Sequence, residues 1–124
     1  MIIRRLKDMK SIIALDNSII RELLNPNHDQ EDLHLNYSLA HATVKPGEST
    51  LSHRFFEASE VYYILQGRGL MHVNDETQDI QPGDMIYIPP QGIQYIENTG
   101  DIDLEFLCIV DPPWFPEAEE QTSL

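Results

Sequence analysis

GESTLSHRFFEASEVYYILQG, residues 47–67, places a histidine, a carboxylate and an apolar run between two glycines. Side chains alternate between the two faces of a strand, so His53 and Phe55 share one face of an extended segment. Glu60 and Tyr62 share one face of the next segment for the same reason. The pattern predicts two strands whose polar side chains, His53 and Glu60, point into one interior.

The sequence on either side of this stretch reads as short strands separated by Gly and Pro turns. Residues 66–69 predict a hairpin turn, because two glycines there supply the backbone conformations of a tight turn. Many short, evenly spaced strands favour a closed or sandwiched all-β fold. We expect strands over residues 35–44, 60–65, 70–73, 85–88, 94–98 and 104–110.

The chain of 124 residues has the length of one domain. We expect residues 1–35 to form short strands, one helical turn at 20–24 and a surface loop. Together these elements should cover the barrel or a dimer partner. Residues 36–111 predict the barrel itself. Residues 112–124 predict a C-terminal tail, in which Trp114 and Phe115 pack on the barrel and the last residues are disordered.

Composition excludes several kinds of partner. The 8 Lys+Arg against 21 Asp+Glu give a formal charge of -13, and such a charge repels nucleic acid and anionic membrane surfaces. The single cysteine, Cys108, lies in an apolar run and resembles a small buried residue. We expect a cytoplasmic protein, because a lone thiol suits a reducing compartment.

Residues 61–65 and 104–110 are apolar on nearly both faces of their strands. An antiparallel strand with one solvent-facing side alternates apolar and polar residues instead. Either a second subunit or the N-terminal strands must cover the outer face. We therefore predict a homodimer.

The spacing of these residues resembles the first motif of the cupin superfamily. That motif reads Gly, five residues, His, one, His, three or four, Glu, six, Gly. Gly47, His53, Glu60 and Gly67 match it, and Phe55 stands where the second histidine would be.

A second cupin motif, Gly, five residues, Pro, one, Gly, two, His, three, Asn, is matched in part. Gly83, Pro89 and Asn98 fit, whereas Gln91 replaces the glycine and Gln94 replaces the histidine. The resemblance implies a double-stranded β-helix, or jelly-roll barrel. The wider sequence is similar to small single-domain cupins labelled mannose-6-phosphate isomerase-like.

Cupins of the usual type hold a divalent metal with three histidines and a glutamate. The resemblance therefore implies a site of His53, Glu60 and Gln94 for Mn, Fe, Ni or Zn, with His41 as a reserve ligand if it points inward. An amide oxygen is a weaker ligand for transition metals than an imidazole. The residues expected to line the pocket are Phe55, Tyr62, Met71, Tyr87 and Cys108.

These residues leave three hypotheses open. The first is a metal-dependent enzyme, of dioxygenase or isomerase type, that acts on a small oxygenated metabolite. The second is a non-catalytic cupin that binds or senses a small organic molecule without a functional metal. In the third, His53 and Glu60 only satisfy each other as buried polar groups. No basic cluster lies near the motifs, which counts against a phosphorylated substrate.

Overall fold

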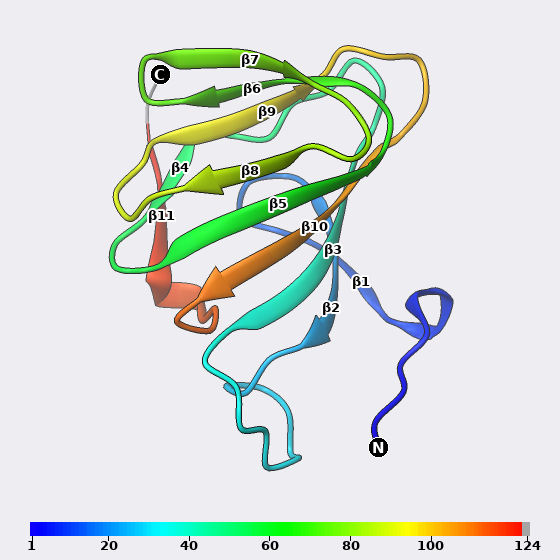
Figure 1. Cartoon of the computed structure of the whole chain (residues 1–124), viewed down its shortest axis with the longest axis vertical. Helices are drawn as coiled ribbons and strands as arrows, with labels where there is room; N and C mark the ends of the chain where they lie inside the picture. The colour runs from blue at the N-terminus through cyan, green and yellow to red at the C-terminus, as the bar shows by residue number, and fades with distance from the viewer. Residues whose placement is uncertain (123–124) are drawn as a thin grey trace.

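The computed structural model describes residues 1–122, which form two antiparallel sheets that face each other (Figure 1). Two short 3-10 helices, η1 (Leu6–Asp8) and η2 (Pro116–Ala118), complete the fold. The first sheet has the order β1 (Ser11–Ile13), β2 (Ile19–Leu24), β3 (Ser38–Val44), β10 (Leu104–Asp111), β5 (Ser59–Gln66) and β8 (Met85–Ile88). The second has the order β11 (Glu119–Gln121), β4 (His53–Phe55), β9 (Gln94–Asn98), β6 (Gly69–Val73) and β7 (Glu76–Ile80). The predicted all-β jelly-roll barrel is confirmed.

Strand register determines which side chains point into the barrel. Cys108 of β10 lies opposite Ala40 of β3 on one side and opposite Tyr62 of β5 on the other. Side chains in such a row share one face of the sheet, and all three line the interior cavity. The next row, which contains His41 and Tyr63, therefore belongs to the outer face of the sheet.

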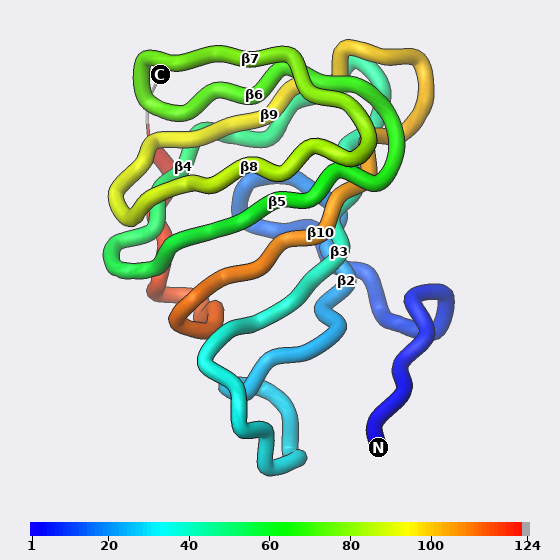
Figure 2. Tube along the Cα trace, in the orientation of Figure 1, coloured from blue at the N-terminus to red at the C-terminus, as the bar shows by residue number. Residues whose placement is uncertain are grey.

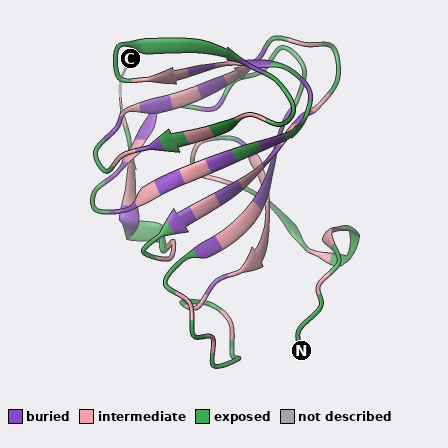
Figure 3. Ribbon diagram, in the orientation of Figure 1, coloured by how far each residue is buried: buried purple, intermediate pink, exposed green. Residues whose placement is uncertain are grey.

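Apolar side chains from both sheets fill the barrel beyond this row. Ile64, Ile96, Leu104 and Phe106 are each at most 1% exposed, and buried residues alternate with less buried ones along β9 and β10 in Figure 3. Full burial of one such side chain contributes about 1.5–3 kcal/mol. This core holds the sheets together and leaves open space on the side of the barrel lined by Ser38.

The chain changes sheets at the glycines after β5 and does not form the predicted hairpin. β5 pairs with β10 and β8, whereas β6 pairs with β7 and β9, and Figure 2 shows the chain turning from one sheet into the other. Gly67 has a φ of +85°, and a Cβ there would lie 2.7 Å from the Asp103 carbonyl oxygen. Glycine is needed at this crossing because two backbones approach closely.

One other expectation about secondary structure is wrong, and one strand was not predicted. Residues 20–24, predicted as a helical turn, belong to strand β2 and pair with β1 and β3. Residues 76–80, where no strand is predicted, form β7 at the edge of the second sheet. An edge strand with solvent on one side tolerates polar side chains, so β7 lacks the apolar pattern of a buried strand.

The C-terminal tail is more ordered than predicted. Strand β11 pairs with β4, and Trp114 packs on a small core cluster that includes Phe55. Phe115, in contrast, is 44% exposed. The final residues 123–124, where disorder is predicted, lie outside the described residues.

The outer face of the six-stranded sheet is exposed at β5 and β8 within residues 1–122, although His41 and Thr43 of β3 are buried on the same face. Tyr63, Met85 and Tyr87 are 44%, 60% and 56% exposed on it. The N-terminal strand β1 lies at the far edge of this sheet, beside β2. Within residues 1–122, no helix is long and apolar enough to cross a membrane.

Candidate functional site

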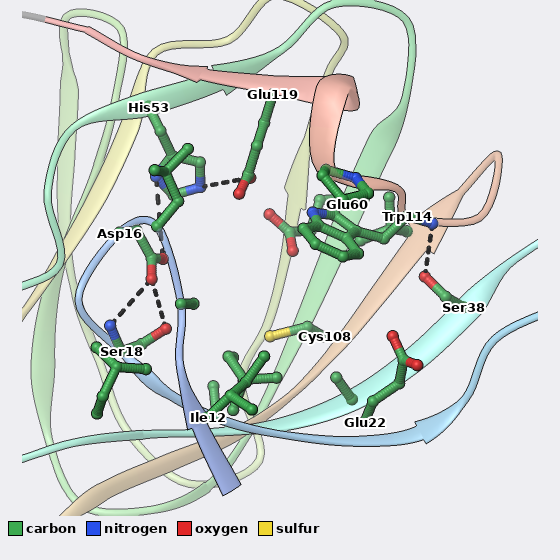
Figure 4. Close-up of a pocket in the computed structure, with 18 of the residues that line it drawn as sticks. Ile12, Asp16, Ser18, Glu22, Ser38, His53, Glu60, Cys108, Trp114 and Glu119 are labelled. Carbon is green, nitrogen blue, oxygen red and sulfur yellow. Dashed lines mark hydrogen bonds and ion pairs between the residues drawn. The ribbon is translucent and has the colours of Figure 1, made fainter. Parts of the chain in front are cut away.

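A cavity of about 670 Å³ opens between the two sheets. Its walls come from β2, β3, β4, β5 and β10, from the N-terminal segment 9–16 and from the C-terminal segment 114–119. Figure 4 shows that Asp16, Glu60 and Glu119 point their carboxylates into this space. The cavity therefore joins the barrel interior to residues from both ends of the chain.

His53 projects from β4 into the cavity and is 3% exposed. Its Nδ1 lies 3.0 Å from the Leu51 carbonyl oxygen. A carbonyl oxygen only accepts hydrogen bonds, so Nδ1 carries the proton and donates it. Nε2 lies on the opposite side of the ring, 3.9 Å from Oε2 of Glu119. The Leu51 contact thus fixes the orientation of the imidazole, as a backbone carbonyl does for many functional histidines.

Glu60, Gln94 and Tyr62 form a buried hydrogen-bond chain. The Tyr62 hydroxyl donates to Oε1 of Gln94 at 2.9 Å, and Nε2 of Gln94 donates to Oε1 of Glu60 at 3.0 Å. Burial raises the pKa of Glu60 well above its usual range, and the charges of Glu119 and Asp16 raise it further, against the hydrogen bond from Gln94. Burial likewise raises the pKa of Tyr62, so its hydroxyl keeps the proton that it donates.

Glu119 belongs to the site although sequence reasoning missed it. Its side chain is 8% exposed, and strand β11 places it opposite Phe55 of β4. Burial raises the pKa of its carboxyl, an effect that the His53 imidazole opposes. The tail sequence has no strand-like alternation of apolar residues, and only the pairing of β11 with β4 brings Glu119 inward.

Asp16 is a second residue that sequence reasoning missed. Its Oδ1 accepts hydrogen bonds from the Ser18 backbone N–H at 3.0 Å and the Ser18 hydroxyl at 2.6 Å. Its Oδ2 lies 4.0 Å from Nδ1 of His53. The Leu51 backbone N–H donates to the Asp16 carbonyl at 2.7 Å. This bond ties the loop between β1 and β2 to the segment before β4.

The structure brings most of the predicted site together. His53 and Gln94 are register partners on β4 and β9, and Gln94 bonds to Glu60. The predicted lining residues Phe55, Tyr62 and Cys108 border the cavity. The interior shared by His53 and Glu60 follows from strand alternation, as the sequence predicts.

Three predicted residues lie elsewhere. His41 follows the inward-facing Ala40 on β3, so it points to the outer face, where its Nε2 contacts Glu105 at 3.0 Å. Tyr87 is 56% exposed because Ile88 takes the inward position on β8. Met71 is buried in the hydrophobic core, away from the cavity wall. The site therefore gains no second imidazole from His41.

The donor set does not fit the metal centre that the resemblance implies. Gln94 turns its amide nitrogen to Glu60, and its amide oxygen accepts from Tyr62. Phe55 has no donor atom. Within residues 1–122, no three or more His, Cys, Asp or Glu side chains are grouped so that they could hold a metal ion. Metal ligation by His53, Glu60 and Gln94 stays a prediction, in which the ion would share the Gln94 amide oxygen with the Tyr62 hydroxyl.

Two facing antiparallel sheets with a polar site inside define the class of protein, a double-stranded β-helix barrel with an interior site. Residues 40–110 match the family model described as "Cupin domain". The chain belongs to the cupin family. An uncharacterized protein of Methanocaldococcus jannaschii is 45% identical over 112 residues, which cover 90% of this chain and 87% of that protein.

Other similar proteins carry varied names. An oxalate-binding protein of Thermotoga maritima is 38% identical over 71 residues, 57% of this chain and 59% of that protein. The crystal structure of a protein from the same organism, described as a predicted oxalate decarboxylase, has a TM-score of 0.77 at 27% identity over 90% of this chain and 99% of that one. The polyketide cyclase RemF of Streptomyces resistomycificus reaches a TM-score of 0.80 at 23% identity, over 100% of this chain and 87% of that one. The last likeness shows the shared fold alone.

Proposed function

We propose that this protein binds a small organic molecule inside the barrel and that binding does not need a metal. The observation that carries this proposal is the cavity of about 670 Å³, which lies within the size range of small-molecule sites. Phe55, Phe106 and Val110 supply apolar wall, whereas His53 and Glu60 supply polar atoms. A ligand with an apolar body and one polar end suits these walls.

A metal-dependent enzyme of dioxygenase or isomerase type is the second candidate. One observation favours it: the Leu51 carbonyl holds the His53 imidazole by Nδ1, the arrangement that orients metal-binding histidines. Against it, the amide oxygen of Gln94 already accepts a hydrogen bond from Tyr62, and its amide nitrogen donates one to Glu60. The metal-independent function therefore accounts for more of the observed contacts.

Oxalate is a natural suggestion for the ligand, because one relative is named as an oxalate-binding protein. Glu60 and Glu119 both line the cavity of this chain. A dianion placed beside these carboxylates would be repelled at low dielectric. We therefore propose a ligand other than oxalate.

Thermal-shift screening of chelator-treated protein tests the proposed function. A ligand at 100 times its Kd stabilises the folded state by about 2.7 kcal/mol, which raises Tm by several degrees. The matched variant Ala40→Leu extends a wall residue into the cavity and should abolish the shift. Stabilisation that appears only after addition of Mn, Fe, Ni or Zn would favour the metal-dependent enzyme instead.

We also propose that the outer face of the six-stranded sheet joins a second copy of the chain. Tyr63, Met85 and Tyr87 expose apolar surface there. The same sheet carries Arg21 beside His41 in register, and Glu105 bonded to His41. A face with apolar groups and both signs of charge is self-complementary, as a two-fold interface requires.

Light scattering tests this pairing. The wild type should show twice the chain mass of 14.3 kDa, and Tyr63→Arg should reduce the mass to that of one chain. Thr77→Arg, on the exposed edge strand β7, is the control and should leave the mass unchanged. A wild-type mass of 14.3 kDa at micromolar concentration would contradict the dimer.

A further inference from the structure

The charged side chains on the cavity wall are nearly all acidic. Four carboxyl groups line it, and Lys10, which is exposed, is the only lysine or arginine among the described residues that do so. Opposite charges attract strongly where water is excluded. The wall therefore favours a ligand that carries positive charge. The four acidic residues are Asp16, Glu22, Glu60 and Glu119.

Two of these carboxylates already have strong partners. Glu22 accepts hydrogen bonds from Asn25 at 2.9 Å and from the His28 ring at 2.8 Å. Asp16 accepts two hydrogen bonds from Ser18. Neither group needs a ligand to satisfy it.

Glu119 and Glu60 have fewer hydrogen-bond donors around them than Glu22 and Asp16. The Glu119 side chain is 8% exposed, and the 3.9 Å between its Oε2 and Nε2 of His53 is too long for a hydrogen bond. The neutral Trp114 side chain is the hydrogen-bond donor beside it, so its charge has no positive partner in bonding distance. Glu60 is 5% exposed and receives a hydrogen bond from Gln94 on one oxygen, Oε1. Both carboxylates point into the same space (Figure 4). Buried carboxylates that face each other lack the positive partner that such groups normally have.

Aromatic side chains form much of the remaining wall. The Trp114 backbone is anchored, because its N–H donates to Ser38 Oγ at 3.0 Å and its carbonyl accepts from Asn25 at 3.0 Å. Aromatic rings attract ammonium groups through their negative faces, and tryptophan does so most strongly. The four aromatic wall residues are Phe55, Tyr62, Phe106 and Trp114.

We propose that the ligand is a small organic cation, a primary or secondary amine on an apolar body, whose ammonium N–H groups bind Glu60 and Glu119. Its apolar body contacts the aromatic wall. A primary or secondary ammonium has N–H donors for both carboxylates, which a quaternary ammonium lacks. This inference rests on the proposed function, because it names the ligand class of the same cavity.

Calorimetric titration with matched probes tests the ligand class. Each probe set has one hydrocarbon group with three polar ends of different charge: 2-phenylethylamine, 2-phenylethanol and 3-phenylpropanoate share the 2-phenylethyl group, and the cyclohexyl analogues form a second set. Within a set, the amine should bind at least about tenfold more tightly than the alcohol, a difference of about 1.4 kcal/mol. The carboxylate should bind least tightly, and N,N,N-trimethylation of the amine should weaken binding.

Neutral isosteres of the two glutamates supply the second arm. Glu119→Gln and Glu60→Gln should each weaken amine binding by about tenfold or more, as loss of a charge-assisted hydrogen bond does, and should leave the alcohol unaffected. Glu117→Gln, an exposed neighbour, is the matched control and should change neither affinity. Equal affinity for amine and alcohol in the wild type would overturn the amine assignment even if a variant failed to fold.

The two proposals fail in different ways. If an alcohol, carboxylate or trimethylammonium probe binds as tightly as the amine and Ala40→Leu abolishes that binding, the ligand class is wrong and the binding function stands. If no probe binds and no member of a wider neutral, cationic and anionic library stabilises the chelated protein, the proposed function itself is overturned.

Discussion

Glu119 lies directly opposite Phe55 across the β4–β11 pair. Phe55 occupies the place where the first cupin motif has its second histidine, so the barrel strand has no polar side chain at that point. The C-terminal strand supplies a polar side chain there, because Glu119 lines the cavity from the neighbouring position. The cavity thus has a carboxylate beside the position at which the motif places an imidazole, and a carboxylate favours a positively charged ligand.

The raised pKa of Glu60 predicts a specific pH dependence of stability. Burial disfavours the charged carboxylate, so its pKa is higher in the folded protein than in the unfolded chain. Folding then binds a proton, and stability falls as pH rises from about 4.3, the pKa of an ordinary glutamate, through the raised value. Glu60→Gln should flatten this fall and raise Tm at pH 8. Tm measured from pH 4 to pH 9 checks it, with Glu57→Gln, an exposed glutamate, as the control. An identical profile in Glu60→Gln and wild type would show that Glu60 is not destabilised by burial.

Tyr62→Phe tests the buried hydrogen-bond chain. The variant removes the hydroxyl that donates to Gln94 and leaves a buried amide oxygen without its donor. We expect a loss of about 1–3 kcal/mol in the free energy of unfolding. Urea denaturation measures it, and Tyr63→Phe on the exposed outer face should cost about 0.5 kcal/mol or less. Equal losses in the two variants would show that the hydrogen bond from Tyr62 to Gln94 does not stabilise the folded state.

Gly67→Ala tests the crossing between the sheets. Gly67 and Gly47 both have positive φ, at +85° and +77°, but only Gly67 lies against another backbone, with Leu104 Cα 2.9 Å from the added Cβ. The strain of placing alanine at a positive φ should lower the free energy of unfolding by about 1–2 kcal/mol in each variant. Overpacking should add about 1–3 kcal/mol to Gly67→Ala. If urea denaturation gives the same loss for Gly47→Ala, the close approach does not constrain the fold.

The strands that were predicted well have strong local patterns. β9 begins and ends where the sequence indicates, at Gln94 and Asn98, and β10 extends the predicted 104–110 by one residue. The inward placement of His53 and Glu60 follows from alternation within two adjacent strands. Such local signals are sufficient for the barrel and for half of the site.

The other half of the site depends on contacts between distant parts of the chain. Glu119 is 64 positions along the chain from Phe55, its register partner on β4, and its strand has no apolar pattern. Asp16 reaches the cavity through a loop that is held by a backbone bond to Leu51. The misplacement of His41 has a simpler cause, because sequence alone does not say which face of β3 is inside.

Calorimetry on chelator-treated wild type and Ala40→Leu is the most direct test of metal-independent binding in the cavity. The account predicts that an amine ligand binds the wild type with one site per chain, that added Mn, Fe, Ni or Zn leaves its affinity unchanged, and that Ala40→Leu abolishes it while keeping a wild-type Tm or a higher one. Binding that requires an added ion, or that persists unchanged in Ala40→Leu, would contradict it.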